Sequence, residues 1–143
     1  MKYIKTLAVS LALTLSIASL SAAAIEATAS KEKVVMQVSD ADSGKWNLAL
    51  NNAKNVQQSY GADNIEVEIV VYGPGIGMLK ADSIVGNRIE EAKLSGVKVV
   101  ACENTMKANK LTKADMLPDS SYVPSGVVEL IQKERTGFVY IRP

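Results

Sequence analysis

VKVVACENTMKANK, residues 97–110, is the stretch from which the fold can be inferred. Its first six residues form an apolar, β-branched run that is typical of a buried strand. The residues at about 104–110 then indicate a short helix. Cys102, the only cysteine of the chain, ends the predicted strand and therefore lies at the junction of the two elements.

The same alternation extends in both directions from this stretch. The sequence predicts four strands, at 33–39, 65–72, 97–102 and 138–143. It predicts helices at 45–60, at 83–94, at about 104–110 and from Pro124 onward. Because strands and helices alternate with connections of helix length, we expect a mainly parallel sheet covered on both faces, a three-layer α/β fold.

Residue spacing predicts which side chains of these elements face inward. The helical residues expected to pack against the sheet include Ile84, Ile89, Ala92, Val127, Leu130 and Ile131. Glu66 and Glu68 alternate with apolar residues, so we expect one face of the first half of that strand to be wet. Asp42 or Ser43 is expected to cap the helix at 45–60, and Gly61 to end it.

The first 24 residues have the three-part order of a secretory signal peptide. Two lysines precede an apolar run from Leu7 to about Ala24, which ends in three alanines suited to cleavage. A membrane anchor is the alternative, but serine and threonine residues dilute the run. We therefore expect cleavage, a periplasmic location without membrane attachment, and one mature domain at 25–143.

The composition excludes several classes of function. Of 16 basic residues, two lie in the leader, which leaves 14 against 15 acidic ones and a net charge of −1. A protein that binds nucleic acid through its phosphates normally has a basic excess, so we expect no such partner. The absence of histidine excludes Ser-His-Asp and Cys-His catalysis, and a single cysteine excludes an internal disulfide or a Cys-rich zinc site.

Candidate binding residues follow three of the predicted strands, at the end of the sheet where open α/β folds bind ligands. Gly73 and Gly75 belong to the segment GPGIG, which could hold an anion with backbone N–H groups or form a tight turn that needs positive φ. Asp40, with Asp42 nearby, could bind a hard cation or serve in turn formation and capping. The third candidate is Cys102.

Cys102 combines a reactive group with a favourable position. A thiol at a helix N-terminus experiences the positive end of the helix dipole, which favours the thiolate over an ordinary pKa of about 8.5. Because a thiolate attacks sulfur, such a residue suits persulfide or disulfide chemistry, and we expect it to be solvent-reachable. An inert, buried cysteine that fills the end of the strand is the alternative.

Five segments of the chain resemble the DsrE/DsrF-like family. They are KWNLALNNAKN (45–55), VVYGPGI (70–76), VKVVACENTM (97–106), VPSGVVELI (123–131) and GFVYIRP (137–143). The resemblance extends from about Lys33 to Pro143 and is closest to an exported, single-domain branch. It implies a sheet of about five parallel strands, so that one more strand should lie within 111–123. It also implies homo-oligomers, often trimers, and we expect Met116, Leu117 and Tyr122 to contribute to the contact.

The resemblance also implies a function. In the better-known cytoplasmic members, one cysteine takes up a sulfane sulfur and passes it on. Here the corresponding candidate is Cys102, with Asn104, Thr105 and nearby N–H groups to hold the charged sulfur. The implied role is a sulfur carrier that needs no cofactor or metal and exchanges sulfur with a donor or acceptor protein, which leaves open whether it is an enzyme. The alternative is a non-catalytic module for small-ligand binding or assembly with a structural cysteine.

Overall fold

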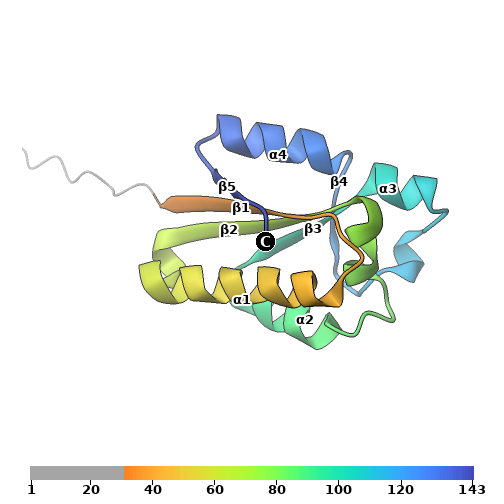
Figure 1. Ribbon diagram of the computed structural model, residues 1–143, viewed down its shortest axis with the longest axis horizontal. Coiled ribbons are helices and arrows are strands. Elements are labelled where there is room, and N and C mark those ends of the chain that lie inside the picture. Colours follow the sequence, from red (N-terminus) through yellow and green to blue (C-terminus); the bar gives the residue numbers. More distant parts are fainter. Residues whose placement is uncertain (1–30) are drawn as a thin grey trace, which may run out of the picture.

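A computed structural model describes residues 31–143, in which five parallel strands form one sheet in the order β4-β3-β2-β1-β5 (Figure 1). The strands are β1 (Glu32–Val38), β2 (Ile65–Val71), β3 (Lys98–Cys102), β4 (Ser121–Val123) and β5 (Val139–Ile141). The expected leader and its cleavage site lie outside the described residues.

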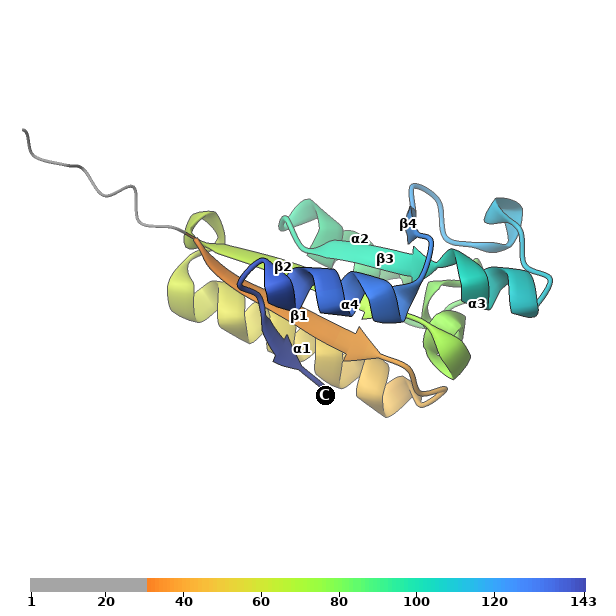
Figure 2. The same ribbon diagram turned by 90° about the horizontal axis from the view of Figure 1, so that it is seen from above.

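Helices cover both faces of the sheet, which confirms the expected three-layer α/β/α fold (Figures 1 and 2). On one face lie α1 (Ser43–Tyr60) and α2 (Gly86–Leu94), and on the other lies α4 (Gly126–Arg135). The short α3 (Glu103–Ala108) continues from the end of β3. Within residues 31–143, none of the helices combines the length and hydrophobicity needed to span a bilayer.

β4 is the additional strand that was expected within 111–123. It pairs with β3, and Val123 is opposite Cys102. The strand has only three residues, Ser121, Tyr122 and Val123, which is too short for an alternating pattern to be recognised. The expected strand is therefore confirmed, although the residues that form it carry no pattern from which its position could be predicted.

The predicted ends of α1 are confirmed. Asp42 caps the helix, because its Oδ1 accepts a hydrogen bond from the N–H of Gly44 at 2.7 Å. Gly61 follows the last turn with a φ of +84°, a left-handed value that glycine adopts without strain. Its N–H donates to the carbonyl of Gln57 at 2.9 Å and so satisfies one of the free carbonyls at the end of the helix.

The predicted inward position of Ile84 is wrong. This side chain is 79% exposed, because α2 begins only at Gly86 and Ile84 lies in the preceding turn. In that turn the Ser83 hydroxyl accepts a hydrogen bond from the N–H of Val85, and Val85 enters the core in place of Ile84. Ile89 is buried as predicted, and Ala92 packs against the core.

Two of the three apolar residues expected to face inward from the last helix face outward instead. Val127 is 50% exposed and Ile131 is 44% exposed, whereas Leu130 is buried as predicted. The inner face of α4 carries Glu129 and Lys133 beside Leu130, because this helix covers a polar part of the sheet. A pattern that assumes an apolar sheet beneath the helix therefore assigns the wrong side chains to its inner face.

That polar part of the sheet centres on Glu68 in β2. The expectation of a wet face holds for Glu66, which is exposed, but it is wrong for Glu68, which is fully buried. Glu68 and Val70 lie on the face that α4 covers, where a small apolar cluster includes Val70 and Leu130. The larger apolar cluster lies on the opposite face, against α1 and α2.

Candidate functional site

Cys102 lies at the carboxyl end of β3 and is the N-cap residue of α3. Its side chain is only 4% exposed, so the expectation that it is solvent-reachable is wrong for this conformation. β4 runs alongside it, with Val123 opposite Cys102, and the first turn of α4 follows three residues later at Gly126. The sulfur therefore lies inside the junction of three elements rather than on an open rim.

Thr105 is the main hydrogen-bonding partner of the sulfur. Its backbone N–H donates to Cys102 Sγ at 3.4 Å, and its hydroxyl is near enough to lower the pKa of the thiol. The N–H of Gly73 donates to Thr105 Oγ1 at 2.9 Å. Because that bond uses a lone pair of the oxygen, the hydroxyl hydrogen remains free to point toward the sulfur.

These donors change the acidity of the thiol. Burial alone raises the pKa of Cys102, since a charged sulfur loses hydration. Hydrogen bonds from the Thr105 hydroxyl, and from the backbone N–H groups of Gly126 and Thr105, lower it by more, with a smaller contribution from Asn104. The net result is a thiol pKa below its ordinary value, so the surroundings of the sulfur favour the thiolate.

Of the site residues predicted from sequence, Gly73, Thr105 and Cys102 come together. Asn104 is adjacent, but its side chain is exposed and its N–H donates to the carbonyl of Pro124 at 3.2 Å. That bond ties the start of α3 to the segment that leads into α4. The structure therefore gives Asn104 a backbone contact, and no contact between its side chain and the sulfur.

The segment GPGIG is a structural turn. It forms a 3₁₀ helix, η2 (Gly73–Leu79), and Gly73 has a φ of +53°, as the turn interpretation requires. Both candidate amides already have acceptors, because the N–H of Gly75 donates to the carbonyl of Tyr72 at 3.1 Å and that of Gly73 to Thr105. An anion cradle made of these two N–H groups is therefore not supported.

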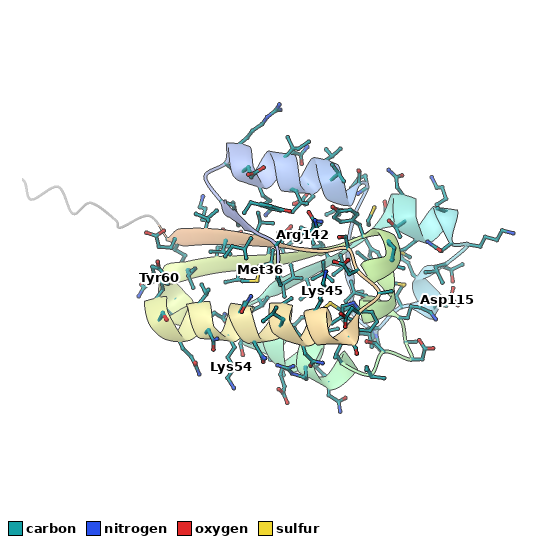
Figure 3. All side chains as sticks on the ribbon, in the orientation of Figure 1. Met36, Lys45, Lys54, Tyr60, Asp115 and Arg142 are labelled. Atoms are coloured by element: carbon teal, nitrogen blue, oxygen red, sulfur yellow. The ribbon has the colours of Figure 1, made fainter. Side chains whose placement is uncertain are left out.

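Asp40 lies at the carboxyl end of β1 with basic neighbours. Its carboxylate is 3.0 Å from Lys45 Nζ and 3.8 Å from Arg142, both of which are labelled in Figure 3. Its carbonyl accepts a hydrogen bond from the indole of Trp46 at 2.7 Å. With Asp42 occupied as the cap of α1, this arrangement matches the turn-and-capping interpretation and offers no cation site.

Sequence reasoning missed Gly126 and Tyr72 at this site. A Cβ at Gly126 would lie 2.9 Å from Tyr72 Cβ, so only glycine allows the ring to pack against the first turn of α4. Burial raises the pKa of the Tyr72 hydroxyl, and the nearby Tyr140 adds to this effect. The available signal in the sequence is a glycine in the first turn of the predicted last helix, two residues after Pro124.

The segment expected to contact another subunit uses its apolar side chains within the domain. Met116 is 3% exposed and belongs to the larger core cluster, against which Leu117 and Tyr122 also pack. One group of exposed apolar side chains lies instead on the neighbouring elements α4 and β5. They are Val127, Val128, Ile131, Val139 and Tyr140.

Comparison with known proteins identifies the family. The sequence model of the DsrE/DsrF-like family matches residues 32–143, and the chain belongs to this family. The solved structure of a protein of unknown function from Methanobacterium thermoautotrophicum is similar, with a TM-score of 0.75 and 28% sequence identity. The similarity covers 79% of this chain and 100% of that one. A comparison with curated proteins gives no match.

Proposed function

We propose that the protein is a sulfur carrier in which Cys102 holds a sulfane sulfur as a persulfide. The observation that carries the proposal is the hydrogen bond of 3.4 Å from the N–H of Thr105 to the buried Cys102 Sγ, together with a thiol pKa that the nearby Thr105 hydroxyl and Gly126 backbone help to lower. A negative sulfur needs such donors when it is buried, whereas a neutral packing cysteine does not. Family membership supports the same role, because sulfur transfer through a cysteine is known among its cytoplasmic members.

The chemistry needs no cofactor. The Cys102 thiolate attacks the outer sulfur of a persulfide or polysulfide and forms a new S–S bond. The S–S bond of the donor breaks, and the donor leaves as a thiolate or as a polysulfide anion shorter by one sulfur. A nucleophilic acceptor on a partner protein then attacks the outer sulfur of the persulfide, and Cys102 leaves as a thiolate. No net oxidation or reduction of the carrier occurs over the cycle. A periplasmic location, which the leader implies, restricts donor and acceptor to that compartment and excludes tRNA.

Intact mass spectrometry of protein recovered from the periplasm tests this proposal. Polysulfide should add about 32 Da per sulfur atom to the folded protein, and a reductant should remove it. The Cys102→Ser variant should fold and show no addition, since the substitution is nearly isosteric. The same spectrum reports whether the 24 leader residues have been removed.

Two results together would favour the alternative, a binding or assembly module with a structural cysteine. The first is modification of Cys102 only after denaturation. The second is a Cys102→Ser variant that unfolds at a clearly lower urea concentration than the wild type, as expected when a buried packing group is replaced by a polar one.

We also propose that the chain forms homo-oligomers through the apolar face of α4 and β5. Val128 and Ile131 are 48% and 44% exposed on the outside of this helix. Light scattering should give a multiple of the monomer mass for the wild type, and a Val128→Lys/Ile131→Lys variant should be monomeric. Ile84→Lys is the matched control, because Ile84 is 79% exposed but lies before α2 on the other side of the sheet. A wild type that stays monomeric at micromolar concentration would contradict the proposal.

A further inference from the structure

Glu68 carries a buried carboxylate that neither the core nor the sulfur chemistry explains. Its Oε2 lies 2.7 Å from Lys133 Nζ on α4 and 3.0 Å from Lys98 Nζ on β3. Both contacts are close ion pairs that fall short of regular hydrogen-bond geometry, and Oε1 has no hydrogen-bonding partner among the described residues. Two more carboxylates, those of Glu66 and Glu129, lie 3.9 and 3.8 Å from the same Lys133 Nζ.

This cluster concentrates charge under α4. Burial raises the pKa of Glu129, and the nearby Glu68 carboxylate adds to this effect, while Lys133 opposes it. Removing a carboxylate from water is strongly unfavourable, and the lysines offset this cost only where the geometry is held. Such a pair adds little net stability, but it restricts how the two elements that carry it can lie relative to each other.

α4 needs such a restriction, because its apolar contacts are few. Only Gly126 and Leu130 of its ten residues are buried. One end is held near Cys102, where Val123 pairs with β3 and the carbonyl of Pro124 accepts the N–H of Asn104. A second fixed point is required to stop the helix from turning about its axis or tilting over the sheet.

The Glu68–Lys133 pair has the right spacing for that second point. Gly126 and Lys133 are seven residues apart, so they lie on the same side of the helix and about 10 Å apart along its axis. On the sheet, Glu68 is level with Lys98, and Cys102 is four residues further along β3, about 13 Å away. The side chain of Lys133 is long enough to span the difference between these two separations.

We propose that Glu68 and Lys133 are positioning residues for Cys102: their ion pair fixes α4 over the sheet so that the first turn of this helix, at Gly126, stays beside the sulfur. The inference rests on the proposed function, since it assigns these residues a role in keeping the sulfur reactive. It connects a charged cluster in the middle of the sheet to a thiol at its carboxyl end through one short, rigid helix.

The pH dependence of alkylation by iodoacetamide, which measures the thiol pKa of Cys102, tests the inference in Glu68→Gln. Loss of the positioning should raise the thiol pKa by about one unit and lower the rate at pH 7 several-fold, as expected for one weakened hydrogen bond to a charged group. The direction of the change in thiol pKa separates the positioning role from a direct electrostatic effect. A direct field effect of removing a negative charge would lower the thiol pKa instead.

Two further variants make the test decisive. Glu66→Gln is the matched control, because this exposed residue of the same strand is 3.9 Å from the same lysine and should leave the pKa unchanged. Glu68→Gln/Lys133→Met removes both charges of the closest pair, so neither is left buried without the other, and it should fold even where Glu68→Gln does not. It should still raise the thiol pKa.

The outcomes separate the two proposals. A wild-type thiol that reacts readily, together with variants whose pH profile is unchanged or shifted downward, would overturn the positioning role and leave the sulfur carrier intact. A wild-type thiol that reacts only after denaturation would overturn the sulfur carrier first.

Discussion

Replacing Gly75 with alanine should destabilise the protein by about 3 kcal/mol or more, the upper range for forcing an extra atom into a packed site. A Cβ at this position would lie 2.6 Å from the carbonyl oxygen of Val38 and 2.9 Å from its carbonyl carbon. These are backbone atoms at the end of β1, and they cannot turn aside as a side chain could. The midpoint of urea unfolding, measured by circular dichroism, should fall sharply.

Gly77→Ala provides the control for this prediction. Its new Cβ would meet only the ring of Trp46, at 3.3 Å, and both glycines lie in the same 3₁₀ helix, η2. Neither has a positive φ, so conformational strain does not differ between the two substitutions. Unfolding midpoints that fall equally in the two variants would show that the close approach to β1 is not what requires glycine at position 75.

A second large effect is expected for Thr105→Val, on reactivity. Valine keeps the shape of threonine but removes the hydroxyl, which contributes most to lowering the pKa of the Cys102 thiol. That pKa should rise by about one unit or more, and below the pKa each unit removes about nine tenths of the thiolate. The rate of alkylation at pH 7 should therefore fall about tenfold, while the rate well above the pKa should change little.

Thr105→Ser separates the role of the hydroxyl from that of the side-chain shape. Serine keeps the oxygen that accepts the N–H of Gly73 and donates to the sulfur, so its pH profile should stay close to that of the wild type. The valine variant also leaves that N–H without its acceptor, and some loss of stability is expected for this reason. If valine and serine gave the same thiol pKa, the hydroxyl would not be what stabilises the thiolate.

Most of the fold could be predicted from the sequence because it depends on hydrophobic patterns spread over many residues, which a single residue does not change. Strands β1 to β3 are apolar β-branched runs, and α1 has a capping aspartate and a terminal glycine, so their positions follow from local rules. β4 could not be located in this way, since its three residues are a strand only because β3 presents an unpaired edge to them.

The candidate site could be predicted only in part. Cys102, Thr105 and Gly73 were named because they follow strands, and the ends of parallel strands meet at one edge of the sheet. The burial of Cys102 could not be foreseen, because it depends on where α4 lies. The same is true of Glu68, whose alternating pattern is that of a solvated face until a helix with an inward lysine covers it.

The crossover from β4 to β5 has a consequence for how anything reaches the sulfur. α4 is joined to the sheet by its two shortest strands, each paired over three residues, whereas β1 and β2 are paired over seven. The segment from β4 to the C-terminus, residues 121–143, should therefore detach while the central strands stay paired, which is local unfolding rather than global unfolding. The separation of β4 from β3, which is the first step of that opening, uncovers Cys102. The free energy of that opening is readable from hydrogen exchange at the β3–β4 amides. It sets how readily a donor or acceptor reaches the sulfur, whereas the closed form is the one in which the thiolate is stabilised.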